Sequence, residues 1–533
     1  MHVIIWSMDY EEKRRKQALR IFVAEAGMVI SVIIIVIIAV MAAMGFFISS
    51  NGQIGQSGLV QLHSLPTGAS VELDGSTLFA RTNLSRTLSE GEHTFKIYRD
   101  GYDTWEKKIN VYPGALMRLY YPRLFLQNRT AETVLGLNQN DAKLNLEFYS
   151  PARNREYILY ALDNDSTWHL LDMRGDKVKD RMLDLSGVLP GMVELAEDLD
   201  IEASAKTANN SPVENKKFKF EGKIKRAEWS ANAEKILVEV EYAGQDSWVL
   251  VNLGDVSKSL DLTETFGLNF ERVEIIDAAA NRLYVLENQH LRQIDAGNKS
   301  LSKVILNNVA DFSNSGSSVV YLKATKEKEG DATMYEIGSY RDGEEGSVPI
   351  KTVEDDAAIK VALARFYDED YICYTVDQKL TVFYGMLPSY KEKSDSDPEI
   401  DLSGLETLIA DYDLPYLPKN LGASPDGEYL VASAGERLMV TDLATAEIAN
   451  YDAISTNWKW FDASMMYALR DGAIIVWDFD GQNQRDLSAS RTEEKNLETL
   501  NYPVLVTANN RWLYYLTKNE GGVLQLTRER IWG

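Results

Sequence analysis

A four-strand pattern repeats along most of this chain, and it limits the possible folds more than any other feature. Each copy has an aromatic or apolar residue, a short turn, a strand rich in Tyr, Leu and Val, and a second strand ending near Asp or Asn. Eight copies follow one another, anchored at Phe148, Trp229, Ile276, Phe312, Phe366, Ala423, Phe461 and Thr507. Most anchors lie 36 to 57 residues apart, and one interval of 81 residues contains the acidic insertion 187–220.

This spacing predicts the architecture of residues 123–533. A blade of four antiparallel strands needs about 40–45 residues, and blades arranged radially hide their sheet edges. We therefore expect a β-propeller of seven or eight blades. The segment Arg123–Asn128 is expected to close the ring as a strand against the last blade. A pair of β-sandwiches is the alternative architecture.

The clearest copy of the repeat runs from Ala423 to Leu443 and contains Ser424-Pro425-Asp426-Gly427. This copy resembles the WD-like "PD" repeats of bacterial propellers, such as the propeller half of the periplasmic Tol system. The other copies are more degenerate. The resemblance therefore implies a fold rather than a function.

Residues 27–48 form a run of 22 residues without a charge, which predicts one transmembrane helix. Such a helix is roughly 33 Å long, enough to cross a hydrocarbon core of about 30 Å. The basic residues of segment 1–26 are Lys13, Arg14, Arg15, Lys16 and Arg20, whereas the first one beyond the run is Arg81. The positive-inside rule then places residues 1–26 in the cytoplasm and the rest outside it, in a single-pass protein of the cell membrane. A cleaved signal peptide is the alternative, although the run exceeds the usual apolar region of about 7–15 residues.

A linker rich in Gly, Ser and Gln (49–58) leads into a compact β pattern over residues 59–122. Strands are expected at 59–63, 69–73, 93–99, 104–111 and 115–121. An ordered set of turn and strand residues accompanies them: Ser64, Pro66, Gly68-Ala69, Val71, Asp74-Gly75, Gly91-Glu92-His93 and Gly101-Tyr102. This set resembles the PEGA domain family. The name-giving tetrapeptide reads Pro66-Thr67-Gly68-Ala69, and Arg81-Thr82-Asn83 lacks the family's proline after the first hairpin. The resemblance implies a small β-sandwich-like spacing or adhesion module of envelope proteins, with no shared catalytic residues.

Charge and composition narrow the range of partners and chemistry. The formal net charge is −24, which argues against nucleic acid as a partner. The lone Cys373 stands in an apolar run and can form neither an intrachain disulfide nor a CxxC metal site. The chain lacks GxSxG, HExxH, Walker A and GxGxxG motifs. No catalytic, cofactor-binding or metal-binding residues, and no cofactor, are therefore predicted.

Several residues that resemble site residues have simpler explanations. His63 and His93 lack partners at metal-ligand spacing, and His169 and His290 fall inside repeat strands, so all four are expected to be framework side chains. Asp163-Asn164-Asp165 and Asp478-Phe479-Asp480-Gly481 lack the distal glutamate of a calcium loop and are expected to be turns. The acidic segment 394–399 is expected to be a solvated linker.

The sequence as a whole predicts an all-β ectodomain, a PEGA-like β-sandwich plus a propeller, behind one N-terminal transmembrane helix. The function it favours is a binding or scaffold protein of the cell envelope whose propeller presents a face to a protein or glycan partner. An extracytoplasmic propeller-type hydrolase or lyase is the alternative. Signalling to the cytoplasm is a third hypothesis, and it would need a partner because segment 1–26 holds no domain.

Overall fold

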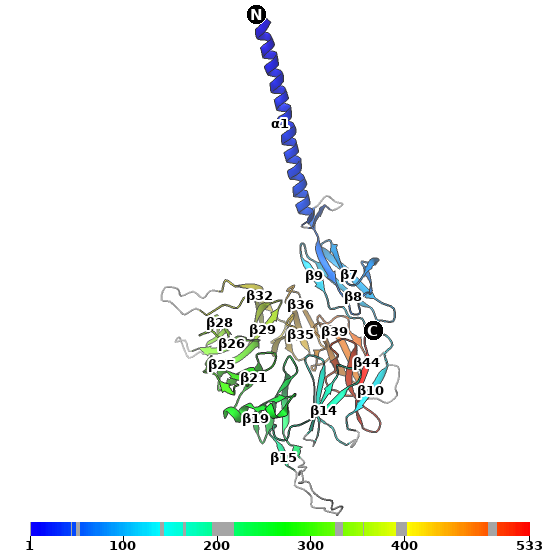
Figure 1. Ribbon diagram of the computed structural model, residues 1–533, viewed down its shortest axis with the longest axis vertical. Helices are drawn as coiled ribbons and strands as arrows, with labels where there is room; N and C mark the ends of the chain where they lie inside the picture. The colour runs from blue at the N-terminus through cyan, green and yellow to red at the C-terminus, as the bar shows by residue number, and fades with distance from the viewer. Residues whose placement is uncertain are drawn as a thin grey trace, which may run out of the picture. The chain divides into compact units, whose positions relative to one another are not determined.

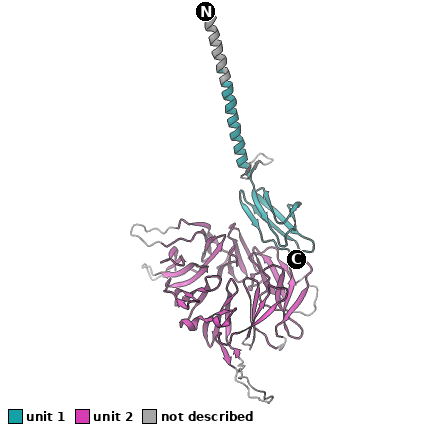
Figure 2. Cartoon of the chain, in the orientation of Figure 1, with its two compact units in different colours: residues 1–124 teal, residues 125–533 magenta. Residues whose placement is uncertain are grey.

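The computed structural model describes residues 2–43, 45–48, 54–138, 143–163, 167–194, 218–325, 334–354, 357–390, 402–488 and 498–532 (Figure 1). The chain divides into two compact units, residues 1–124 and 125–533 (Figure 2). Each unit has its own core and is described separately below.

The first unit begins with one long helix, α1 (His2–Ala43). Within it, Leu19–Met41 has the length and composition to cross a membrane. The predicted helix over 27–48 is wrong at its C-terminal end, because Gly45 adopts a positive φ of 79° and the chain then turns into a hairpin. The hairpin consists of β1 (Phe46–Ile48) and β2 (Ile54–Gln56). The linker expected at 49–58 thus contains β2, and residues 49–53 lie outside the described residues.

Two sheets packed face to face follow in the first unit. The smaller sheet has the order β6 (Leu84–Leu88), β3 (Gly58–Leu62), β9 (Leu116–Leu119), and the larger has the order β5 (Ser76–Arg81), β4 (Ser70–Leu73), β7 (Gly91–Tyr98), β8 (Trp105–Val111). Burial alternates strictly along β8, as expected for a strand with one face toward a core. All five predicted strands are present. The sequence did not predict β5 and β6, because both strands are mostly exposed and have little apolar pattern.

The motif residues of this module hold its turns together. The Ser64 hydroxyl lies 2.6 Å from the Thr82 hydroxyl, and Thr82 Oγ1 accepts a hydrogen bond from the Ala69 amide at 2.9 Å. Asp74 accepts from the Thr94 amide at 2.8 Å, and its other oxygen lies 2.7 Å from His93 Nδ1. His93 therefore anchors a turn of this module.

The second unit is built from eight blade sheets in chain order and one short two-stranded sheet, counted over the described residues. Blade 1 is β11 (Leu146–Pro151), β12 (Tyr157–Leu162), β13 (Thr167–Asp172), β14 (Lys179–Asp184); blade 2 is β17 (Lys223–Trp229), β18 (Lys235–Tyr242), β19 (Gln245–Asn252), β20 (Leu260–Asp261); blade 3 is β21 (Arg272–Ile275), β22 (Arg282–Glu287), β23 (His290–Asp295), β24 (Ser300–Leu301); blade 4 is β25 (Val309–Ser315), β26 (Ser318–Thr325), β27 (Met334–Arg341), β28 (Val348–Glu354).

The next blades repeat this order. Blade 5 is β29 (Ile359–Phe366), β30 (Glu369–Val376), β31 (Lys379–Gly385), β32 (Leu405–Asp413); blade 6 is β33 (Asn420–Ala423), β34 (Tyr429–Ala434), β35 (Arg437–Asp442), β36 (Ile448–Asp452); blade 7 is β37 (Lys459–Trp460), β38 (Met465–Arg470), β39 (Ala473–Asp478), β40 (Arg485–Asp486). Seven of the eight predicted anchors lie on or directly after the first strand of a sheet, and Thr507 directly follows β42 of the last sheet. The repeat therefore has eight blades.

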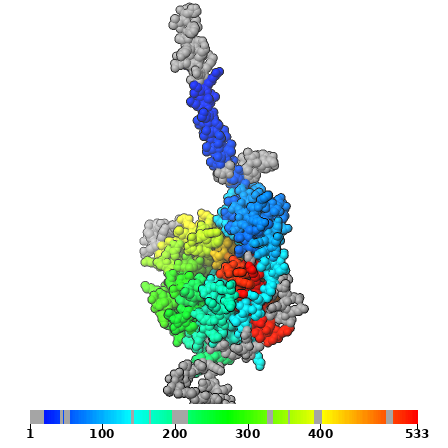
Figure 3. Space-filling view, turned by 45° about the vertical axis from the view of Figure 1, so that its right-hand side comes forward, coloured from blue at the N-terminus to red at the C-terminus, as the bar shows by residue number. Residues whose placement is uncertain are grey.

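Blade 8 closes the ring with strands from both ends of the unit. It contains β41 (Glu498–Thr499), β42 (Leu505–Val506), β43 (Trp512–Lys518) and β44 (Leu524–Arg530), and its outer strand is β10 (Ala131–Gly136), which pairs with β44. In Figure 1, β10 lies beside β44, and Figure 3 shows the red C-terminal residues next to cyan ones. The predicted closing strand at Arg123–Asn128 is wrong, because this segment forms only isolated bridges, such as the one between Arg123 and Leu65.

Short elements decorate the ring between blades. A hairpin of β15 (Met192–Glu194) and β16 (Phe218–Phe220) stands in the acidic insertion, whose residues 195–217 lie outside the described part of the chain. A 3-10 helix (Val256–Lys258) and α2 (Leu262–Phe266) follow β19. Asp261 caps α2 by accepting a hydrogen bond from the Glu264 amide at 2.9 Å.

Adjacent blades pack against one another through apolar faces, from blade 8 through blade 1 to blade 7. Trp168 of blade 1 is fully buried and stacks on Phe148 at 4.9 Å, in a cluster shared with blade 2. Comparable clusters join blades 8 and 1, 2 and 3, 3 and 4, 4 and 5, and 5 and 6. Tyr429 stacks on Phe479 at 4.2 Å between blades 6 and 7. Because neighbouring blades cover both faces of the middle strands, each middle strand is a continuous run of apolar residues in the sequence.

Candidate binding site at the mouth of the central channel

One hydrogen-bonded turn recurs after the inner strand of several blades. In blade 6 the Ser424 hydroxyl donates to Asp426 Oδ1 at 2.6 Å and accepts from the Tyr429 amide at 2.9 Å. Blade 2 repeats this arrangement with Ser230 and Asn232, and blade 8 repeats it with Thr507 and Asn509. The repeated polar residues therefore fix the turns that surround one end of the channel.

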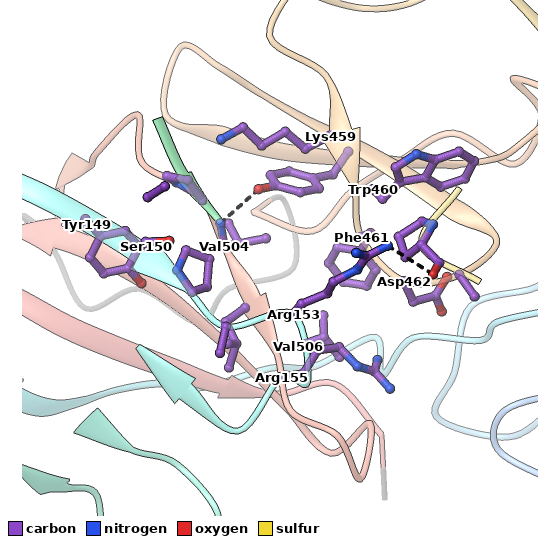
Figure 4. A pocket seen from close by; sticks show the side chains of 18 of the residues that line it. Tyr149, Ser150, Arg153, Arg155, Lys459, Trp460, Phe461, Asp462, Val504 and Val506 are labelled. Carbon is purple, nitrogen blue, oxygen red and sulfur yellow. Dashed lines mark hydrogen bonds between the residues drawn. The ribbon is translucent and has the colours of Figure 1, made fainter. Parts of the chain in front are cut away.

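The larger of two neighbouring cavities at this end has a volume of about 710 Å³. Its walls come from the inner strands and turns of blades 1, 2, 6, 7 and 8, including Phe148–Arg153, Arg155, Lys459–Ala463 and Pro503–Val506. Figure 4 shows Arg153, Lys459 and Trp460 among the side chains that line it. Trp460 and Tyr149 add aromatic surface to this basic wall.

The second cavity, of about 440 Å³, is lined by blades 2 to 6 and by Arg153 of blade 1. The two cavities share Arg153, Pro425 and Asp426. Arg153 Nη2 donates a hydrogen bond to the Pro425 carbonyl oxygen at 3.3 Å, so its side chain reaches from blade 1 to blade 6 (Figure 4). The guanidinium therefore stands where the two cavities meet.

Charges on the inner strands of blades 2 to 4 neutralise one another. Arg226 bonds Glu228 at 2.9 Å and Glu274 at 3.0 Å. Arg272 in turn bonds Glu274 at 2.6 Å and Asp311 at 2.7 Å. Burial, together with the nearby Glu274 carboxylate, raises the pKa of Glu228. This alternating chain leaves little net charge on that side of the channel.

The opposite side of the channel carries cations without carboxylate partners. Among the described residues, neither Arg153 nor Lys459 forms an ion pair, although Arg153 acts on Glu228 at longer range. Both side chains are exposed to the cavity. Partial burial lowers the pKa of Lys459. An anion entering the cavity would meet these two groups.

The carboxylates that line the cavity are occupied by their own turns. Asp462 Oδ1 accepts hydrogen bonds from the Ser464 and Met465 amides, each at 2.9 Å. Asp426 Oδ1 is held by the Ser424 hydroxyl. These carboxylates hydrogen-bond within their own turns and do not pair with Arg153 or Lys459. The two cations are therefore available to a ligand.

The structure places the residues singled out from the sequence outside this site. His63 stacks on Tyr120 at 4.2 Å, and His169 lies 2.9 Å from Asp180. Asp478 accepts from Asn483 at 2.9 Å in a hairpin turn, whereas Asn164, Asp165 and the segment 394–399 lie outside the described residues. No group of three His, Cys, Asp or Glu side chains suited to a metal occurs among the described residues.

Cys373 is fully buried in β30, and burial raises the pKa of its thiol. Sequence reasoning missed Arg153 and Lys459. The one sequence signal that could have identified these two residues is their position within the repeat. Arg153 lies in the repeated turn of blade 1, and Lys459 lies shortly before the repeated turn of blade 7.

Comparison with known families identifies the small module. The family model "PEGA domain" matches residues 57–123, which confirms the resemblance drawn from the motif residues. No curated protein matches the chain by sequence.

Three solved structures illustrate the similarity of the larger unit. An oligogalacturonate lyase in complex with manganese is 13% identical, with a TM-score of 0.36 over 57% of this chain and 87% of that chain. The tricorn protease is 13% identical, with a TM-score of 0.37 over 74% of this chain and 38% of that one. The Cps50 (Swd1) β-propeller domain of Myceliophteria thermophila is 10% identical, with a TM-score of 0.33 over 74% of this chain and 99% of that chain. The propeller assignment for this chain rests on the order of its sheets.

Proposed function

We propose that this chain is a membrane-anchored, non-enzymatic binding or scaffold protein of the cell envelope. In this proposal α1 spans the membrane once with its N-terminus in the cytoplasm, the PEGA module is a spacer, and the propeller holds a partner at the mouth of its channel. The observation that carries the proposal is the pair Arg153 and Lys459, two cations without carboxylate partners on a cavity where five blades meet. A cavity of this size lies within the usual range of ligand sites, about 300–1,000 Å³.

The orientation predicts a labelling pattern with a membrane-impermeant maleimide. Cys373 is fully buried, so the native chain should remain unlabelled. Met386→Cys, at a position 72% exposed on the propeller, should label in intact spheroplasts. Arg15→Cys, before the apolar stretch, should label only after the membrane is permeabilised. The reverse pattern would refute the proposed orientation, and release of a shortened chain into the medium would indicate a cleaved signal peptide.

The binding role predicts that crosslinking depends on position. A photo-crosslinking benzoylphenylalanine at Ala463, on the wall of the larger cavity, should capture one discrete partner in intact cells. The same group at Met182, 70% exposed on the outer strand β14, is the control and should not capture that species. Equal capture at both positions would contradict a channel site. Turnover of a glycan or peptide by the purified chain would favour the hydrolase or lyase alternative.

A further inference from the structure

We propose that the ligand of the channel site is an acidic segment of a polypeptide in extended conformation, whose carboxylates bind at Arg153 and at Lys459 on the cavity wall. The inference rests on the proposed function and deepens it by naming the chemistry of the partner.

The preference for an anion follows from how the charges are distributed. The chain as a whole is strongly acidic, with a formal net charge of −24, and its surface charge repels anions at long range. At the larger cavity, however, the guanidinium of Arg153 has one hydrogen-bond acceptor, a neutral carbonyl oxygen, out of the five donors that such a group carries. The Lys459 ammonium group makes no hydrogen bond with the described residues and is partly desolvated. Carboxylates of the ligand would supply each of these two groups with a charged acceptor.

The preference for a polypeptide follows from the walls of the cavity. Consecutive residues of β11, β37 and β42 line it, and each of these strands is the inner edge of its sheet. An edge strand directs a row of backbone N–H and C=O groups away from its own ladder. An extended peptide offers the matching row of donors and acceptors, as in recognition by strand addition. The surfaces of Phe148, Trp460 and Phe461 would then contact apolar side chains beside the acidic one.

The test uses the full-length chain in detergent micelles and two dye-labelled peptide mixtures. One mixture has the form Ala-Xaa-Glu-Xaa-Ala with apolar residues at Xaa, and the other replaces Glu by Gln. Fluorescence anisotropy should show saturable binding of the Glu mixture and roughly tenfold weaker binding of the Gln mixture, because a charge-assisted hydrogen bond is lost. A trisaccharide of uronic acids serves as the competing anionic ligand and should not displace the Glu mixture.

Two substitutions link the binding to the site. Arg153→Gln and Lys459→Gln should each weaken binding of the Glu mixture about tenfold, whereas Lys379→Gln should leave it unchanged, because Lys379 is paired with Asp413 at 2.9 Å on blade 5. Equal binding of the two mixtures, no saturable binding, or binding insensitive to Arg153 and Lys459 would overturn the proposal. Binding of the trisaccharide that depends on both cations would assign an acidic glycan instead.

The outcomes also separate this inference from the proposed function. If the peptides fail while crosslinking at Ala463 still captures a partner, only the acidic-peptide ligand is refuted. If crosslinking at Ala463 fails as well, the channel site itself is refuted.

Discussion

Glu529→Ala is expected to destabilise the propeller by about 3–5 kcal/mol, the usual cost of leaving a buried charge without its partner. Glu529 is fully buried on β44, and its carboxylate lies 3.3 Å from Nε of Arg129, whose side chain is 3% exposed. Tyr515 donates a hydrogen bond to the other carboxylate oxygen at 2.5 Å. Arg129 also donates to the Leu487 carbonyl oxygen of blade 7. The pair therefore ties the segment before β10 to the last two blades.

Urea unfolding followed by tryptophan fluorescence measures this effect. Lys379→Ala is the control, because it removes one partner of an exposed ion pair and should cost less than about 1 kcal/mol. A double variant, Arg129→Met with Glu529→Leu, removes both charges together and should recover most of the lost stability. The interpretation is wrong if Glu529→Ala shifts the unfolding midpoint no more than Lys379→Ala does.

Gly427→Ala should cost about 3 kcal/mol, from two causes that act together. Gly427 ends the Ser-Pro-Asp-Gly turn with a φ of 82°, where a side chain adds roughly 1–2 kcal/mol of strain. A Cβ there would also stand 2.3 Å from the Arg365 carbonyl oxygen of blade 5, and forcing tightly packed atoms apart costs about 1–3 kcal/mol. The turn of blade 6 is therefore pressed against blade 5 at the channel mouth.

Gly435→Ala separates the two causes in the same blade. Gly435 has a φ of 69°, but a Cβ there meets no atom within 4 Å, so this variant should show the strain alone, about 1–2 kcal/mol. Thermal unfolding of both variants checks the difference. Equal losses would mean that blades 5 and 6 separate freely at this contact.

Much of the fold could be predicted from the sequence, because the repeat is carried by residues with a local role. Ser424, Asp426 and their counterparts bond their own turn, so the signal stays within a few residues. The closing strand was misplaced for the opposite reason. Arg123–Asn128 is the more apolar segment, and Phe125 is indeed buried, stacked 5.2 Å from Trp532, but it makes no regular ladder. The true strand β10 is an outer strand with few buried residues, so it carries no comparable pattern.

The candidate site could not be predicted in the same way. Arg153 and Pro425 meet across 272 positions of sequence, and nothing local distinguishes Arg153 from an ordinary turn residue. What makes Arg153 and Lys459 distinctive is that the inner strands of blades 2 to 4 neutralise their own charges while these two side chains have no such partner. That asymmetry exists only once the ring has formed.

The pairing of β10 with β44 also sets the order in which the chain can mature. During synthesis β10 is made before the blades, whereas its partner β44 is made after blades 1 to 7. Until β44 has been made, β10 has no partner strand, and an unpaired strand can pair with other chains. Its short length, its Glu132 charge and its few buried residues reduce that hazard. A ribosome stalled before residue 524 would therefore leave an open ring, with β10 as its unprotected edge.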